Sequence, residues 1–497
     1  MRVKPHIPST TGRIVALCLV LSGCATVGPN FSAPQAPTAT ALAGAGERVP
    51  ERVLATGDAA PAGPWWRALG SKALDDVMAR ALAHNHTLAA ADATLAKVRA
   101  QAEREHAALG PSVTGAGTFQ RDRINTSAFG FAGFPSPTIS LYNIGPSVSY
   151  DLDLAGGGRR RVEAARARLR AEGFKADAAY LTLTGNVALQ AVRIAALRAQ
   201  IEALQGVVED DRRSIDIRRK AEAAGGDSPS AGLGGQLRLQ QDLALIPPLT
   251  QQLAQARHAL ALLVGEAPSE WSPPDFTTAD FVLPATIPVG LPSALLRRRP
   301  DIQAAEAAVH ADTAMVGVAT SRLYPDVRLV AGLTQEGLNP GSLFGFGATA
   351  YNFGPSASAP LFDGGAIRAD RRAAQAQVRA SLAEYRQTVI TAFTQVSDVL
   401  SALSEDEEKL ATLDRAEATA RASLEEAREG YRLGGVPLAT VVAADRVWRG
   451  ASLARVEALG QRLANVVALY GATAADWRIV APDPDKHQTL APVRHSP

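Results

Sequence analysis

Few side chains in this 497-residue sequence have the types and spacing that chemistry requires. His84 and His86 are two residues apart on an expected helix, so they point to different faces and make a poor pair of metal ligands. The acidic run from Glu405 to Glu408 could suggest a cation site, but consecutive helical positions splay around the axis, which favours a solvated face. Because no catalytic or metal-ligating set converges, the sequence predicts no enzyme, no metal and no cofactor.

A basic run and two glycine runs are further candidates for ligand binding. Arg297 to Arg299 precede Pro300, which suits the first turn of a helix because its missing N–H is harmless there; an anion site is the alternative. The glycines at 156–158 and 364–365 lack both the GxGxxG spacing and a Walker lysine, so we interpret them as turns.

Cys24 is the residue whose surroundings predict a covalent modification. Basic residues precede an apolar stretch from Ile14 to Leu21, the pattern of a secretory signal too short to span a bilayer. The small residues before Cys24 resemble the lipobox of bacterial lipoproteins, which implies cleavage after residue 23 and a covalent lipid on Cys24. A free buried thiol is the alternative. Cys18 would leave with the signal, so the mature chain would have no internal disulfide.

Charge and composition exclude other classes of protein. Lys plus Arg is 51 and Asp plus Glu is 49, a balance that offers no basic surface for a nucleic-acid partner. The sequence is 46% hydrophobic but only 5% aromatic, which favours long helices rich in Ala and Leu. No later segment has 18 or more uninterrupted apolar residues, so a membrane span would have to be β.

The chain contains the same order of segments twice. Residues 142–149 recur as residues 351–358, an offset of 209, while Val113 matches Val327 at an offset of 214. Each half has a helix, two extended segments, a very long helix and a shorter helix. In both long helices, apolar residues step by three and four in alternation, which is the seam of a coiled coil. Each would run about 64 residues, or about 95 Å.

The extended segments alternate with period two. Between Tyr142 and Leu154 the even positions are mostly apolar and the odd ones include Asn143, Ser147 and Asp151, which predicts a membrane-spanning strand with two different faces. The edge of a soluble sheet is the alternative for any one strand. The four strands expected in one chain cannot close a barrel in lipid by themselves, because an open sheet edge leaves backbone N–H and C=O groups without hydrogen-bond partners. The sequence therefore predicts an oligomer.

Several motifs together resemble the TolC-like outer membrane factors, in the lipoprotein branch that serves RND-type drug-efflux pumps. The resemblance covers nearly the whole mature chain. Its most specific parts are residues 24–31 after the lipobox, Trp65-Trp66, residues 296–302 with Ala305-Glu306, Tyr324-Pro325 and residues 431–435.

This resemblance implies an α+β membrane protein. Its expected architecture is a homotrimer with a 12-strand transmembrane β-barrel, four strands per chain, continuous with a long periplasmic α-helical barrel and carrying the internal two-fold repeat. The expected partners are a periplasmic adaptor protein, an inner-membrane RND transporter and outer membrane lipids. The helix tips that would contact the adaptor contain Gly225, Gly226, Leu433, Gly434, Gly435 and Val436.

The resemblance also implies a periplasmic gate. Tyr431 and Arg446 match residues that such proteins use to hold the tip closed. The acidic positions expected just past the second turn are missing, because that stretch is Thr440-Val441-Val442-Ala443-Ala444. An acidic selectivity ring is therefore not predicted there.

The predicted domains follow the repeat. They are a signal peptide (1–23), a lipidated tether (24–64), a first repeat (65–271), a linker (272–291), a second repeat (292–480) and a disordered tail (481–497). The first repeat has a helix, strands at 112–121 and 138–154, and helices at 159–222 and 236–264. The second has a helix, strands at 326–336 and 348–362, and helices at 366–432 and 437–470.

We therefore expect an outer membrane channel of a tripartite efflux system, a passive exit duct for drugs or other small toxic compounds. A duct for type I protein secretion is the near alternative, and a periplasmic coiled-coil scaffold without a pore is the alternative from another class.

Overall fold

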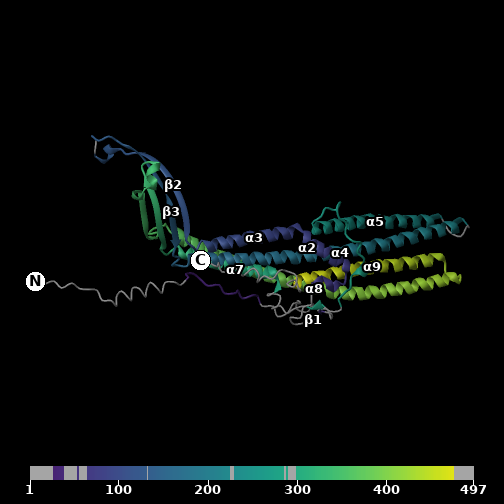
Figure 1. The fold of residues 1–497 in the computed structure, drawn as a ribbon. Coiled ribbons are helices and arrows are strands. Elements are labelled where there is room, and N and C mark those ends of the chain that lie inside the picture. Colours follow the sequence, from purple (N-terminus) through teal and green to yellow (C-terminus); the bar gives the residue numbers. More distant parts are fainter. Residues whose placement is uncertain are drawn as a thin grey trace. The chain divides into compact units, whose positions relative to one another are not determined.

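The computed structural model describes residues 26–37, 53–54, 64–130, 133–223, 229–284, 287–288 and 298–474. The chain forms two compact units, each described separately below (Figure 1). The strand unit comprises Met1–Gln35, Leu95–Glu172 and Ala305–Tyr385, and the helix unit comprises Ala36–Thr94, Gly173–Ala304 and Arg386–Pro497. The predicted signal peptide, Cys24 and the C-terminal tail lie outside the described residues.

The strand unit contains one antiparallel sheet with the order β2-β3-β5-β6. Its strands are β2 (Ser112–Arg123), β3 (Thr138–Asp151), β5 (Asp326–Gly337) and β6 (Thr349–Ser358). One face is polar, and there the Oγ atoms of Ser112 and Ser149 lie 2.9 Å apart and hydrogen-bond across β2 and β3. Figure 1 shows β2 and β3 in blue beside the green second hairpin.

The two hairpins of the sheet have the same register. In the first, Val113 pairs with Val148, and in the second, Val327 pairs with Ala357. These pairs are related by the sequence offsets of 214 for β2 and β5 and 209 for β3 and β6. The sequence duplication therefore extends to the backbone pairing.

The second strand of each hairpin ends before the sequence predicts, at Asp151 rather than 154 and at Ser358 rather than 362. An aspartate follows each strand and turns the chain into a long helix. Asp153 has a φ of 43° and accepts hydrogen bonds from the N–H groups of Gly158 and Arg159. Asp363 accepts from Gly365 and Ile367 in the second half. These bonds satisfy the first free N–H groups of each long helix and so fix where the helix begins. The strand therefore ends before this point, although the alternation of apolar residues continues in the sequence.

Short 3₁₀ turns connect the strands within each hairpin. They are η2 (Thr126–Phe129), η4 (Pro340–Phe344) and η5 (Phe346–Ala348). The strand unit also includes α7 (Pro300–Ser321) beyond residue 304, and the beginnings of α4 (Gly157–Ala223) and α8 (Ala366–Arg432). Gly157 allows α4 to approach α7, because a Cβ atom there would lie 2.2 Å from the Ser321 Oγ.

The helix unit has an apolar core formed by the rest of both long helices and the helices beside them. These are η1 (Trp65–Leu69), α2 (Lys72–His84), α5 (Pro229–Val264) and α9 (Leu438–Thr473). Most of the predicted seam residues are buried, including Val187, Ile194, Val389 and Val396 at 0% exposure. Trp65 stacks on Tyr470 with ring centroids 5.3 Å apart, which joins the start of the first repeat to the end of the second. Two short elements, β1 (Val53–Leu54) and β4 (Ile287–Pro288), pair in parallel, and η3 (Thr278–Asp280) lies between α5 and β4.

The structure differs from the predicted helices in two places. The single first helix is split at Asn85 into α2 and α3 (His86–Ala107), because the Asn85 side chain accepts from the Leu88 N–H and begins a new helix. The helix predicted from 236 begins at Pro229 instead, so Gly232, Gly234 and Gly235 are helical rather than part of a turn. Proline suits a first helical turn, and glycine weakens a helix without forbidding it.

Candidate functional site

The turn between α8 and α9 is an exposed helix tip. The Gly434 N–H donates to the Tyr431 carbonyl at 3.0 Å, and the Gly435 N–H donates to the Gly430 carbonyl at 2.8 Å. Gly434 has a φ of 74°, a left-handed conformation that favours glycine at the end of a helix. Of the predicted tip residues here, Leu433, Gly434 and Gly435 are exposed and Val436 is half-buried. Gly225 and Gly226 of the other predicted tip lie outside the described residues.

The two predicted gate residues lie near this tip, on different helices. Tyr431 is 48% exposed at the end of α8, and Arg446 is exposed on α9. In the described part of a single chain, no hydrogen bond joins Tyr431 to Arg446. Arg446 instead lies within electrostatic range of Asp211 on α4. Its positive charge favours the ionised form of the Asp211 carboxyl and so acts to lower the pKa of that group.

Asp211 on α4 faces Asp242 on α5, and the two carboxyl groups share a partly buried position. Asp242 is 8% exposed, and one oxygen of each carboxyl has no hydrogen-bond partner within the described residues. Burial, followed by the hydrogen bond and the charge of Asp242, raises the pKa of Asp211 to about 6, although Arg446 and Arg238 oppose the rise. Two carboxyl groups this close favour sharing one proton.

A second acidic pair lies beside the first and is held by arginine. Arg449 on α9 forms ion pairs with Asp210 on α4 and with Asp445 in its own helix, the second at 3.5 Å. Arg428 on α8 also reaches Asp445, at 3.3 Å. Burial first, and then the charge of Asp445, raises the pKa of Asp210, while Arg449 lowers it. Three helices, α4, α8 and α9, are thereby connected through charged side chains.

Sequence reasoning missed all four aspartates. The resemblance implies acidic gate residues within residues 440–444, where this sequence has none, and Asp445 is the next residue along. Asp242 is the only acidic residue of α5, an isolated charge in a helix that otherwise has few. A single acidic residue in such a helix is the sequence feature that could have identified Asp242 as a functional candidate. The meeting of Asp211 and Asp242 depends on how two helices pack, which no local pattern contains.

The segment that follows Cys24 is fixed to the strand unit by Arg160. This arginine is 3% exposed and donates to the Asn30 Oδ1 at 2.7 Å and to the Val27 carbonyl at 3.2 Å. It also forms an ion pair with Glu163 at 2.7 Å. Gly28 packs against α7 so closely that a Cβ atom would lie 2.4 Å from the Gly317 Cα. The chain is therefore held in place a few residues after the predicted lipidation site.

His310 on α7 completes this docking site. Its ring stacks on Phe31 at a centroid distance of 4.2 Å, and its Nε2 lies 3.0 Å from the Glu163 Oε1. Its Nδ1 lies 2.8 Å from a nitrogen of Arg170, which can only donate, so Nδ1 accepts that hydrogen bond and Nε2 faces the Glu163 carboxylate as a donor. Burial raises the pKa of Glu163, but hydrogen bonds from His310 and Arg160 outweigh it and the pKa is lowered.

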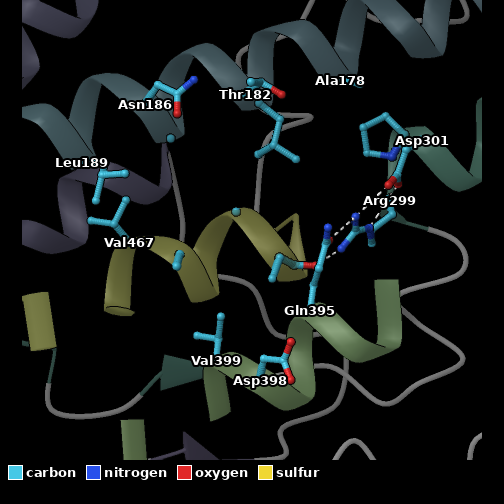
Figure 2. A pocket seen from close by; sticks show the side chains of 16 residues that line it. Ala178, Thr182, Asn186, Leu189, Arg299, Asp301, Gln395, Asp398, Val399 and Val467 are labelled. Carbon is cyan, nitrogen blue, oxygen red and sulfur yellow. Dashed lines mark hydrogen bonds and ion pairs between the residues drawn. The ribbon is translucent and has the colours of Figure 1, made fainter. Parts of the chain in front are cut away.

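A cavity of about 550 Å³ opens in the helix unit between α4, α8, α9 and the start of α7 (Figure 2). Its walls are mainly apolar, and Arg299 is buried at one end. Figure 2 shows Arg299 directed toward Asp301 and Gln395, with nitrogen–oxygen distances of 2.6 and 2.8 Å. A further bond from Arg299 reaches the Ala472 carbonyl at 2.9 Å. The Arg299 guanidinium thus connects α7 to α8 and α9, and its bonding favours the helix-start interpretation over an anion site.

Within the described residues, no cluster of three or more His, Cys, Asp or Glu side chains could hold a metal ion. None of the helices in the described ranges is long and apolar enough to cross a bilayer.

The family model for outer membrane efflux proteins matches residues 77–266 and 291–475, about three-quarters of the chain, with one match in each repeat. The chain belongs to this family. The predictions of family, outer membrane location and efflux function are confirmed.

Two relatives of this outer membrane efflux protein match over nearly their whole length. The pyoverdine export outer membrane protein OpmQ of Pseudomonas aeruginosa is 28% identical over 470 residues, covering 94% of this chain and 96% of OpmQ. The toluene efflux pump outer membrane protein TtgC of Pseudomonas putida is 28% identical over 476 residues, with coverages of 93% and 95%.

Solved structures agree with the fold of the efflux protein. The outer-membrane channel OprN is 27% identical, with a TM-score of 0.81 over 91% of this chain and 100% of OprN. The outer membrane channel CmeC of Campylobacter jejuni has a TM-score of 0.82 at 20% identity, over 93% and 98% of the two chains, and supports the fold alone. The family and these neighbours are channels, which fits the prediction that the chain is not an enzyme.

Proposed function

We propose that three copies of this chain form the exit duct of a tripartite efflux system. Each copy would contribute its four strands to a 12-strand barrel in the outer membrane and its long helices to a helical barrel in the periplasm. The observation that carries the proposal is the four-stranded sheet itself. Its outer strands β2 and β6 are both edges within one chain, and open edges in lipid leave backbone groups unsatisfied.

The cargo would be a small molecule that the duct itself does not select. Efflux relatives are named for pyoverdine and toluene, and a further one, CusC of Escherichia coli, for cations. Such different cargoes among related ducts support a passive, water-filled path, with selection by an inner-membrane RND transporter. A periplasmic adaptor would bind the exposed tip at Leu433 to Val436, together with the other tip, which contains Gly225 and Gly226.

The lipid on Cys24 would anchor the duct to the outer membrane. Docking of residues 26–31 through Arg160 supports this placement, because it fixes the chain close to the predicted acylated residue. Acylation contributes membrane affinity by burying methylene groups.

The mass of the detergent-solubilised protein and its conductance test this proposal. A trimer's mass together with discrete single-channel conductance in planar bilayers is expected. A monomeric mass, or a trimer without conductance, would contradict a pore, and the second result would favour a scaffold.

The tip would be the periplasmic gate, and Tyr431 and Arg446 would belong to it. We predict that combining Tyr431→Phe with Arg446→Ala raises basal conductance in planar bilayers, because both changes remove polar groups that would join neighbouring helices at the gate of the trimer. Replacing the exposed Arg415, away from the tip on α8, with Ala is the matched control. Unchanged conductance in the double variant would remove both residues from the gate.

A further inference from the structure

The cavity in the helix unit has the size and lining of a small-molecule site. Its volume of about 550 Å³ lies within the range of ligand pockets, about 300–1,000 Å³, which are mostly apolar with a few polar groups. Leu189 of α4 and Val399 of α8 contribute to its apolar walls, and Thr182 and Asn186 of α4 add polar groups. The bonds that Arg299 makes at one end use none of these four side chains.

Two glycines keep this space open. A Cβ atom on Gly185 of α4 or on Gly471 of α9 would have no contact within 4 Å beyond its own stretch of backbone, and both residues line the cavity. Glycine weakens a helix relative to residues that carry a side chain, and no close approach requires it at these two positions. Each helix therefore has a residue that lowers its own stability and enlarges the cavity.

The cavity opens on the side of α4 opposite to the apolar core. Val187 is fully buried in that core, whereas Leu189, two residues later and so on another side of the helix, is 37% exposed. Thr182 and Asn186 lie seven and three residues before Leu189, share its side of the helix and are exposed as well. Solutes can therefore reach the cavity without any change in the core.

The cavity wall has one negative charge that no other group neutralises. Arg299 and Asp301 pair with each other at 2.6 Å, but Asp398 on α8 forms no hydrogen bond or ion pair within the described residues. Figure 2 shows Asp398 across the cavity from Asn186. In the same part of the chain the side chains of Thr182 and Asn186 also have no hydrogen-bond partner. An apolar pocket with a free carboxylate matches an organic cation in both polarity and charge.

From these observations we infer that the cavity binds a small amphipathic organic cation, with its apolar body against Leu189 and Val399 and its charged group beside Asp398. Because this assignment rests on the proposed duct, the ligand would be a class of its cargo, namely positively charged compounds with an apolar or aromatic body. Three copies of the chain would provide three such sites. Such a site retains matching cargo for longer without excluding other compounds, so selection still belongs to the transporter.

Binding of tetraphenylphosphonium to the detergent-solubilised full chain tests this site, and tetraphenylborate is a probe of the same shape and opposite charge. Equilibrium dialysis, corrected with detergent alone, measures saturable binding of each ion. We expect the phosphonium to bind at least tenfold more tightly than the borate. Asp398→Asn should weaken phosphonium binding at least fivefold. Glu408→Gln, at an exposed acidic residue of α8 that does not line the cavity, should leave it unchanged.

A second pair of variants tests the space itself. Gly185→Leu fills the cavity and suits a helix better than glycine does, so we expect a folded protein with at least fivefold weaker phosphonium binding. Gly173→Leu places the same side chain at another open position of α4, outside the cavity, and should bind the phosphonium as the unmodified chain does.

Three results would overturn the assignment. Equal phosphonium binding by Asp398→Asn and the unmodified chain would remove the carboxylate from the site, and equal binding by Gly185→Leu would place the ligand elsewhere. Tighter binding of the borate would reverse the charge of the ligand and point to the exposed Arg193, one turn beyond Leu189.

The mass and the conductance of the same preparation separate failure of the site from failure of the proposed function. A conducting trimer without saturable phosphonium binding contradicts only the site, and a neighbouring copy that fills the cavity would give this result. A protein that binds the phosphonium but shows no conductance contradicts the duct, and with it the description of the ligand as cargo.

Discussion

At the scale of single residues, several buried or partly buried charged groups join segments that are far apart in the sequence. Arg160 holds the N-terminal segment, Arg299 connects three helices, and Asp211 shares a buried position with Asp242. Buried charged groups are costly unless they are paired and hydrogen-bonded. Each of these groups therefore fixes the geometry of the backbone around it.

Replacing Arg160 should release the segment that follows the predicted lipid anchor. Arg160→Leu removes several hydrogen bonds and leaves carbonyl groups of the segment unpaired, so we predict a loss of roughly 3 kcal/mol in stability. Amide hydrogen exchange at Val27, whose N–H donates to the Ala155 carbonyl, should rise at least tenfold. Arg161→Leu, at an exposed neighbouring position, is the control and should change neither measurement. Equal protection in both variants would show that Arg160 does not hold the segment.

The pH dependence of stability should reveal the carboxyl pair. The pKa of Asp211 is raised to about 6 in the folded chain, above the ordinary value of 3.8. Its contribution to stability is therefore full below about pH 4 and is lost as the pH rises through 6. Asp242→Asn should supply an amide donor to Asp211, lower its pKa and flatten this dependence.

Melting temperatures at pH 4.5 and 7.5 measure this effect. Asp242→Asn should reduce the difference between the two temperatures relative to the unmodified chain. Asp216→Asn is the control, because Lys220 lowers the pKa of that exposed carboxyl and its titration lies below this range. A difference that Asp242→Asn leaves unchanged would mean that the pair does not share a proton.

At the scale of elements, turns decide where the long helices end. The tip of α8 and α9 depends on one glycine in a left-handed conformation, and the starts of α4 and α8 depend on Asp153 and Asp363. These short segments direct helices of 67 residues, so small local changes have effects at a distance.

Gly434→Ala should loosen this tip. A left-handed φ costs a residue with a Cβ atom about 1 kcal/mol relative to glycine, so we predict a loss of that size. Gly435→Ala is the matched control, because the φ of Gly435 is not positive and a Cβ atom there has room. Hydrogen exchange of the backbone amides at positions 434 and 435 should increase only in the Gly434→Ala variant. An equal increase in both variants would contradict the role of the left-handed turn.

At the scale of the whole molecule, the duplication is expressed in contacts as well as in sequence. Asn85 and Arg299 are separated by the offset of 214, and both donate to a carbonyl of the penultimate residue of a shorter helix. Asn85 reaches Leu263 of α5 at 2.8 Å, and Arg299 reaches Ala472 of α9 at 2.9 Å. Different side chains thus perform the same docking in the two halves.

This equivalence predicts similar effects of two different substitutions. Asn85→Ala and Arg299→Ala should each destabilise the helix unit by about 1–3 kcal/mol, because each leaves a partly or fully buried carbonyl at a helix end without its donor. Denaturant unfolding in detergent measures the loss, and the exposed Arg67→Ala serves as control. A loss confined to one of the two variants would show that the docking sites are not equivalent.

The sequence alone determined the features that depend on local periodicity. The two coiled-coil seams, the alternating strand faces and the order of elements in each half all follow from patterns within one segment. The tip at Gly434 followed from a glycine pair after a helical pattern. These features were predictable because a helix or strand presents its faces at a fixed period.

Only the tertiary structure decided which distant residues meet. The junction of β3 with β5, the Asp211–Asp242 pair and the docking of residues 26–31 on Arg160 each join segments far apart in the chain. Their formation depends on the phase and packing of whole helices and strands against one another, and the sequence of any one segment does not contain that information.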